Sequence, residues 1–290
     1  MSAAASATGD GQQLNPDDFI DDVAVIILAG GTGERLGGSR PKAFVGLAGE
    51  VLLAHSLRAF EDHDAVDSIV LVVPEDWVAP TEVLVDDLGC DRVASIEIAG
   101  SSRAASVVAG LEAVVDRRGT AVLVHDAARP VVPAELIDRV LAPLSEGADA
   151  VVPVLEVTDT IKQVDPSTGK IVATPARADL RRAQTPQACR SSSLHAALRG
   201  LDDAALALIT DCSMAIERNG GSCVVVDGDV RSHKITTAAD LAEIEAILAP
   251  PAPPAEADVA VDASGQVLGD DDPEDLEPLD EEDLAGAETP

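Results

Sequence analysis

Residues 22–44 read DVAVIILAGGTGERLGGSRPKAF, a continuous apolar run followed by a loop that holds five glycines. The apolar run predicts a buried β-strand, and glycines directly after a strand allow backbone N–H groups to approach phosphate oxygens. Arg35, Arg40 and Lys42 lie on this loop, although the whole chain has a formal net charge of −32. The stretch therefore predicts an α/β sheet with a site for a strongly anionic ligand beside its first strand.

Two common phosphate-binding loops do not fit this stretch. It lacks the GK[ST] of a Walker A loop, and Leu36 stands where a dinucleotide fingerprint needs its third small residue. For the glycines alone, an ordinary turn from strand to helix with solvated cations is an equal alternative. Arg35, Pro41 and Lys42 favour a triphosphate, which needs more cations than the pyrophosphate of a dinucleotide.

Composition limits the classes of function. The chain has 290 residues, of which 46% are hydrophobic and 1% aromatic, so a sizeable core must consist of aliphatic side chains. The acidic balance argues against nonspecific binding to nucleic acid or to anionic membranes. The start resembles no secretory signal, and no apolar run has membrane-spanning length. The four cysteines form no CxxC pair, which predicts buried thiols in a reducing cytoplasm. The chain has four lysines, which are Lys42, Lys162, Lys170 and Lys234.

Charge divides the chain into three parts. Residues 1–22 hold five acidic residues and residues 249–290 hold fourteen, and neither segment has a lysine or arginine. Such segments bury too little apolar surface to offset the entropy of ordering, so both are predicted to be disordered. Residues 23–248 form the predicted folded domain.

Within this domain, apolar runs alternate with helical patterns. Strands are predicted at 22–30, 68–74, 120–130, 149–157 and 222–228, and helices at 51–61, 103–115, 134–144 and 238–248. This order predicts a Rossmann-like, mostly parallel sheet flanked by helices. Residues 158–174 break the alternation and indicate two short strands around the turn DPSTG. Too few apolar residues lie between 155 and 182 for this segment to pack alone, so we expect a projecting hairpin arm that needs a partner surface.

Several further motifs occur in an order that is typical of one family. They are LAGGTGERLGGSRPK (28–42), GSSRAASVVAGL (100–111), VHDAARPVV (124–132), VTDTIK (157–162), RAQTPQ (182–187), TDCSMAIERNGG (210–221) and HKITTAADL (233–241). Together they resemble the 2-C-methyl-D-erythritol 4-phosphate cytidylyltransferases of the non-mevalonate isoprenoid pathway. The first motif alone also suits a molybdenum-cofactor guanylyltransferase, but the later motifs do not.

The resemblance implies a reaction between CTP and a polyol phosphate that releases pyrophosphate and uses Mg²⁺, held mainly through the CTP phosphates. It implies catalytic roles for Arg35, Lys42 and Lys234, whose charges stabilise the transferred phosphoryl group. It assigns no role to Arg40, which we expect to be a surface residue. The CTP-binding positions that it implies are Ala29, Gly30, Gly31, Gly33, Ser101 and Ser106. For the two serines, capping of the helix that follows is the alternative role.

The resemblance also implies a second half of the site. Asp126, Arg129 and Thr185 match residues that contact the polyol phosphate, whereas Thr160 and Arg177 match residues that reach it from the arm of a partner subunit. A homodimer with exchanged arms follows from that match. We assign His125 a structural role, because a phosphate nucleophile is already ionised near neutral pH and needs no general base.

Four positions depart from the family's usual pattern: Gly30, Cys212, Met214 and Ser232. None of them removes a charged residue of the expected reacting centre. Two alternatives stay open from the sequence: a ribitol 5-phosphate cytidylyltransferase, which shares the fold and many motifs, and a catalytically inactive nucleotide-binding scaffold protein.

Overall fold

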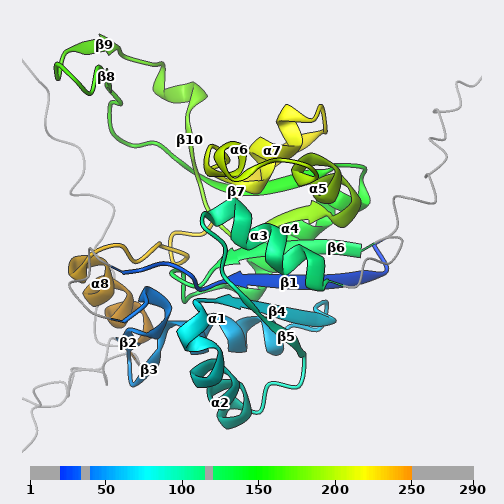
Figure 1. Cartoon of the computed structure of the whole chain (residues 1–290). Helices are drawn as coiled ribbons and strands as arrows, with labels where there is room; N and C mark the ends of the chain where they lie inside the picture. The colour runs from blue at the N-terminus through cyan, green and yellow to red at the C-terminus, as the bar shows by residue number, and fades with distance from the viewer. Residues whose placement is uncertain (1–19, 34–39, 115–119, 250–290) are drawn as a thin grey trace, which may run out of the picture. The chain divides into compact units, whose positions relative to one another are not determined.

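A computed structural model describes residues 20–33, 40–114 and 120–249 of the chain (Figure 1). The expected disordered tails therefore lie almost wholly outside the described residues, as do Arg35 and Leu36. The central sheet has eight strands in the order β10-β7-β11-β6-β1-β4-β5, with β12 paired to β7. Their bounds are β1 Asp22–Leu28, β4 Ser68–Val73, β5 Val93–Ile98, β6 Thr120–Asp126, β7 Ala150–Glu156, β10 Arg181–Ala183, β11 Gln187–Arg190 and β12 Cys223–Asp227.

The sheet is mostly parallel, as the sequence predicts. Strand β1 lies parallel to both β4 and β6, β4 is parallel to β5, and β7 is parallel to β12. Two strands that the sequence analysis does not predict run antiparallel: β10 pairs with β7, and β11 lies between β6 and β7. The expected mixed α/β fold is therefore confirmed, with an antiparallel insertion on one side of β6.

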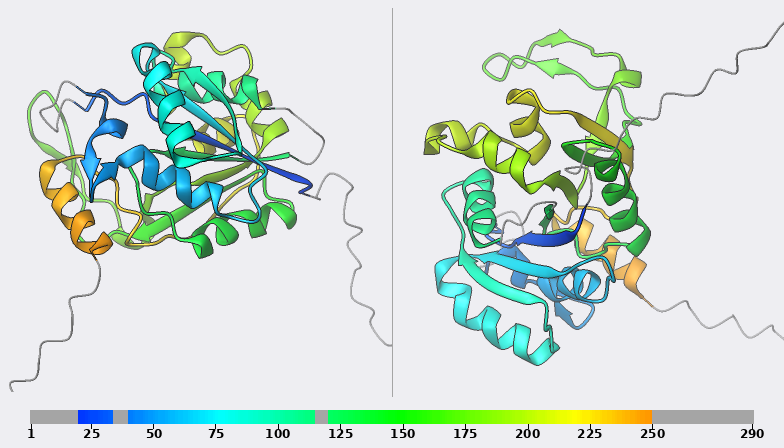
Figure 2. Two further views of the ribbon diagram at one scale, coloured as in Figure 1. Left: turned by 90° about the horizontal axis from the view of Figure 1, so that it is seen from below. Right: turned by 90° about the vertical axis from the view of Figure 1, so that its right-hand side faces the viewer.

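Both faces of the sheet are covered by helices, which explains why β1 is apolar at consecutive positions. Val23, Val25 and Ile27 pack toward α1, α2 and α4, whereas Ala24 and Ile26 pack toward α3, α5, α6 and α7 (Figure 2). The helices are α1 Leu52–Glu61, α2 Val78–Leu88, α3 Arg103–Ala113, α4 Ala134–Ser145, α5 Ser191–Leu198, α6 Asp203–Ala207, α7 Cys212–Arg218 and α8 Ala238–Leu248. Helix α3 ends before Val114, two residues earlier than expected, and Val115 lies outside the described residues.

Short elements complete the chain. A small hairpin, β2 Gly46–Leu47 with β3 Glu50–Val51, packs with α8 around the buried Ile235 and Ile244. The predicted hairpin forms between β8 Gln163–Val164 and β9 Ile171–Ala173, and Figure 1 shows it projecting from the sheet. Three of the four free cysteines are buried, and Cys223 is half-buried. Among the described residues, no helix combines the length and apolar character needed to cross a membrane.

Candidate active site

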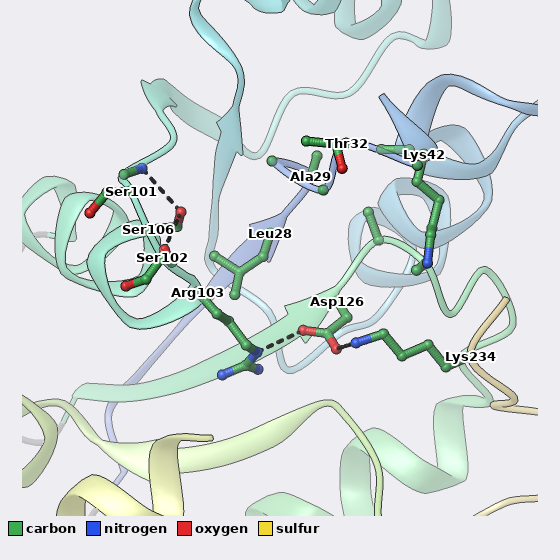
Figure 3. Close-up of a pocket in the computed structure, with 17 residues that line it drawn as sticks. Leu28, Ala29, Thr32, Lys42, Ser101, Ser102, Arg103, Ser106, Asp126 and Lys234 are labelled. Carbon is green, nitrogen blue, oxygen red and sulfur yellow. Dashed lines mark hydrogen bonds and ion pairs between the residues drawn. The ribbon is translucent and has the colours of Figure 1, made fainter. Parts of the chain in front are cut away.

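A cleft of about 650 Å³ opens at the carboxyl ends of β1 and β6, beside the start of α3 (Figure 3). After β1 the chain forms β4 and β5 on one side of β1, and then returns to form β6 on the other side of β1. Such a reversal separates the loops above two neighbouring strands and leaves a crevice between them. The lining residues are 28–33, Lys42, Ala43, 100–103, Ser106, 126–128 and Lys234.

The glycine loop forms one wall of this cleft. Ala29 leaves β1 by donating its N–H to Val72 O (2.7 Å), and Gly31 O accepts the N–H of Lys42 (2.9 Å). Gly33 has a φ of +74°, and a Cβ there would lie 3.1 Å from the Lys42 nitrogen, so a side chain would be both strained and crowded. The loop thus brings Lys42 back beside β1, while Arg40 is exposed as expected.

Lys42 follows Pro41 at the start of a short 3₁₀ helix, Lys42–Phe44. Its ammonium group donates to Ile235 O at 2.8 Å, a contact between residues 193 positions apart. Gly30, Gly31 and Gly33 line the same wall as Ala29. The structure therefore brings all the described members of the predicted loop site into one cleft.

Asp126 stands at the end of β6 and joins two cations. Its Oδ2 accepts from Lys234 Nζ at 2.7 Å, and its Oδ1 accepts from Arg103 Nε at 3.1 Å (Figure 3). Its side chain is only 12% exposed. Burial alone would raise the pKa of Asp126, but the charges of Arg103 and Lys234 outweigh it and hold that pKa well below its usual range. The carboxylate is therefore ionised and orients Lys234 at the cleft.

The sequence analysis missed Arg103. It is the first residue of α3, where a cation opposes the helix dipole, so helix stability does not favour an arginine at this position. An arginine at this position of GSSRAAS, where it does not stabilise the helix, is the feature of the sequence that could have indicated a role in the site. Its guanidinium also lies 3.9 Å from the Sγ of Cys212, one of the four departures from the family pattern.

The serines near the start of α3 differ in their bonds. Ser102 caps the helix by accepting from Ala105 N at 3.1 Å. Ser106 donates its hydroxyl to Ser102 O (3.0 Å) and accepts the N–H of Gly100 (3.1 Å), so it also organises this turn. Ser101 is exposed and lines the cleft. The capping role that was the alternative for Ser101 and Ser106 is thus performed by Ser102.

A buried polar layer lies behind Asp126. Thr185 Oγ1 accepts from Asp126 N (3.1 Å) and contacts His125 Nδ1 (3.1 Å), while His125 Nε2 contacts Arg129 O (3.0 Å). Burial lowers the pKa of His125 to about 4, so the ring is neutral at pH 7, as suits a structural histidine. Arg129 donates to Ser232 O (2.7 Å) and Ala183 O (3.3 Å). Neither Thr185 nor Arg129 lines the cleft of this single chain.

Thr160 and Arg177 lie on the arm and are not among the residues that line the cleft. Both are exposed, and Arg177 Nη1 donates to Thr158 O at 2.6 Å within the arm. The structure of one chain therefore unites Lys42, Lys234 and Asp126 but does not bring the arm residues to them.

The cleft suits anions better than a metal ion. Within the described part of the chain, no three His, Cys, Asp or Glu side chains form a cluster that could hold a metal. Of the described residues that line the cleft, Asp126 alone is a carboxylate, and it is already paired with two cations. This donor set does not form a protein-only Mg²⁺ site, whereas a metal bound by phosphate oxygens needs no such cluster.

Comparison with known proteins identifies the family. The sequence model of the 2-C-methyl-D-erythritol 4-phosphate cytidylyltransferases matches residues 23–250. The chain belongs to this family. The cytidylyltransferase of Streptomyces coelicolor is 39% identical over 233 residues, which cover 78% of this chain and 84% of that protein. That of Rhodococcus jostii is 40% identical over 226 residues, covering 78% and 95%.

Solved structures of this cytidylyltransferase family share the fold. The Thermus thermophilus enzyme superposes with a TM-score of 0.60 at 29% identity, covering 78% of this chain and 98% of that one. The Francisella tularensis enzyme gives 0.64 at 28% identity, covering 77% and 98%. The family resemblance drawn from the sequence motifs is therefore confirmed.

Proposed function

We propose that the chain transfers the cytidylyl group of CTP to 2-C-methyl-D-erythritol 4-phosphate, giving 4-diphosphocytidyl-2-C-methyl-D-erythritol and pyrophosphate. The observation that carries this proposal is the charge of the cleft. Among the described residues that line the cleft, three are cations (Lys42, Arg103 and Lys234) and one is a carboxylate (Asp126), in a chain whose net charge is −32. A triphosphate supplies the negative charge that such a cleft lacks, and the names of the relatives support the choice of both substrates.

In this reaction a phosphate oxygen of the polyol attacks the α-phosphorus of CTP, and the bond from that phosphorus to the pyrophosphate oxygen breaks. Negative charge grows on the α-phosphoryl oxygens and on the leaving group, so positioned cations supply much of the catalysis. Lys42 and Lys234 take this role together, since Lys42 Nζ donates to the carbonyl of Ile235, the residue after Lys234, and Arg35 is the proposed third cation. Mg²⁺ bound by the CTP phosphates would add further charge neutralisation.

The nucleoside and the polyol occupy different walls in this proposal. Ala29, Gly30, Gly31 and Gly33 offer backbone to CTP, and the α3 turn with Ser101 and Ser106 borders the cytidine. Asp126 faces the polyol. Thr185 and Arg129, directly behind it, complete this side when the substrate is bound.

The arm supplies the remainder of the proposal. Thr160 and Arg177 would reach the polyol phosphate of a partner subunit in a homodimer with exchanged arms. Exposed apolar side chains on the arm support its packing against a partner subunit. They are Ile161, Val164, Ile171 and Val172, which are 40–62% exposed in the single chain. We place the enzyme in the cytoplasm, in keeping with its free thiols.

The test is pyrophosphate release from the full chain with Mg²⁺, four nucleoside triphosphates and several polyol phosphates. CTP with 2-C-methyl-D-erythritol 4-phosphate should give the highest kcat/KM, because both the cleft and the relatives favour that pair. Faster turnover of ribitol 5-phosphate would reassign the substrate. Absence of release with every pair would favour a nucleotide-binding scaffold and overturn the proposal.

A further inference from the structure

Lys234 comes from a segment that is neither helix nor strand. β12 ends at Asp227 and α8 begins at Ala238, so no ladder of backbone hydrogen bonds fixes the lysine between them. Yet its ammonium group meets Asp126 at 2.7 Å. Other contacts must therefore hold residues 228–235, here called the Lys234 segment, in place.

The side chain of Gln184 makes several of these contacts. Its Nε2 donates to Asp229 O (2.9 Å) and to Ser232 O (3.2 Å), and its Oε1 accepts from Asp229 N (2.9 Å). The side-chain amide thus uses both donor hydrogens and its oxygen on backbone of the Lys234 segment. Gln184 is 4% exposed and directly follows β10, and its own N–H donates to Pro153 O (2.8 Å). The amide is therefore anchored to the sheet.

At Gly228 the segment passes so close to Gln184 that this position has no room for a side chain. A Cβ built on Gly228 would lie 2.2 Å from Gln184 Oε1 and 3.0 Å from Val154 O. Since Val154 O is backbone of β7, the segment cannot simply shift away from the amide. A methyl group at position 228 must displace either the segment or Gln184.

Further bonds attach the same segment to the turn after β6. Arg129 Nη1 donates to the Ser232 carbonyl that Gln184 also contacts, at 2.7 Å. Ser232 Oγ donates to Val131 O (2.7 Å), and Ile235 N donates to Ala128 O (2.8 Å). Ser232 is fully buried, so each of these polar groups would lose its partner without solvent to replace it.

We propose that Gln184 is a positioning residue that, together with Arg129, clamps the Lys234 segment and so fixes Lys234 at the reacting phosphate. The inference rests on the proposed function, in which Lys234 stabilises the α-phosphoryl group. Gln184 does not line the cleft, so it acts through Lys234 and not on a substrate. Loosening the clamp should therefore lower kcat and leave both KM values nearly unchanged.

The experiment uses the full chain and measures pyrophosphate release with CTP, Mg²⁺ and 2-C-methyl-D-erythritol 4-phosphate. Gln184→Met keeps the length of the side chain and removes the amide, while Gly228→Ala disturbs the same contact from the other side. Gln187→Met is the matched control: Gln187 is 2% exposed, three positions along the same motif, but its amide contacts Asp211 and the Cys212 N–H at the start of α7. Each variant is also made in a Lys234→Ala background, and melting temperatures are recorded.

Gln184→Met and Gly228→Ala should each lower kcat by about 10- to 100-fold, the scale of a small misplacement of a catalytic group, with KM values within about threefold. In the Lys234→Ala background the loss of kcat should be much smaller, because the group that they position is gone and only the effect on Lys42, through its bond to Ile235 O, remains. Gln187→Met should lower the melting temperature with a much smaller effect on kcat.

Three results would overturn the inference while leaving the proposed function intact: equal losses in both backgrounds, a change confined to KM, or an equal loss of kcat in Gln187→Met. Failure of both Gln184→Met and Gly228→Ala to fold would show a general structural role and would also overturn it. A wild-type chain that releases no pyrophosphate would overturn the proposed function and this inference together.

Discussion

The charged groups of the cleft are held by distant parts of the same chain, whereas those of the arm have local partners. Lys42 contacts Ile235, and Lys234 contacts Asp126, across 193 and 108 positions of sequence. On the arm, Arg177 bonds to Thr158, 19 positions away, while Ile171 and Val172 are about 60% exposed. The cleft is thus preorganised by one chain, and the arm has apolar side chains that stay exposed in the described part of the chain. The difference indicates that the described part of the cleft is arranged within one chain, whereas the role proposed for the arm requires a partner.

The largest expected effect is on the preorganised half. Replacing Lys42 or Lys234 by Ala should lower kcat by about 10²–10³, the usual scale for losing one positioned donor to a transition state. Steady-state pyrophosphate release measures it. Arg40→Ala is the control on the same loop, since Arg40 is exposed and has no proposed role. If Arg40→Ala were as damaging as Lys42→Ala, the assignment of the loop cations would be wrong.

A mixed dimer tests the arm. Arg35→Ala and Arg177→Ala should each be strongly impaired, and together they should complement, because one of the two sites in a mixed dimer receives an intact Arg35 from one chain and an intact Arg177 from the other. Random exchange makes half of the dimers mixed, so activity should recover to about one quarter of wild type. The readout is turnover after subunit exchange, confirmed independently with differently tagged chains. No recovery after confirmed exchange would contradict the exchanged arm.

A smaller effect concerns Gly30, in the wall of the cleft that the glycine loop forms. A Cβ on Gly30 would lie 2.7 Å from the Cβ of Ala99, so the two positions together have room for one methyl group. Gly30→Ala should lower kcat/KM for CTP roughly tenfold, because the added methyl group must displace backbone that lines the cleft. Ala99→Gly in the same chain should restore most of the loss. If the double variant is no better than Gly30→Ala, the crowding does not arise from Ala99.

The smallest expected effect is a change in the pH dependence of stability, caused by the layer behind the cleft. Burial lowers the pKa of His125 from 6.5 to about 4, so the unfolded chain binds the extra proton more readily than the folded chain between these values. The free energy of unfolding should therefore be highest above pH 6.5 and fall toward pH 4, by at most about 1.4 kcal/mol per pH unit from this group. Urea unfolding between pH 7 and 4.5 measures it, and His125→Gln should show a shallower slope. Equal slopes in the two chains would show that His125 is not responsible.

Local sequence patterns predict strand β1 and the position of the cleft beside it well. The apolar run of β1 is buried on both faces, and Lys42 lies beside the end of that strand through the bond from its N–H to Gly31 O. Other elements lack such a signal. β11 reads QACR and is buried between β6 and β7, so its burial comes from its neighbours and not from an apolar pattern of its own.

The polar partners in the site are harder to predict, because they depend on tertiary geometry. Arg103 and Asp126 lie 23 positions apart on α3 and β6, and nothing in either motif states that the two side chains meet. Similarly, Gln184 belongs to a motif that the sequence analysis quotes, but its bonds to Asp229 and Ser232 require the end of β10 to lie against the end of β12. Thr160 and Arg177 stay predictions, since their proposed ligand belongs to another subunit.

The positions of the four lysines have a consequence for chemical labelling. Lys42 and Lys234 line the cleft, and Lys162 and Lys170 are exposed on the arm, so the amine-bearing side chains fall within the two regions compared above. A reagent that acylates primary amines would therefore modify only these two regions and the amino terminus. Protection by CTP would identify adducts in the cleft, and protection by dimerisation would identify adducts on the arm, so one mass spectrum would follow nucleotide binding and subunit association at once.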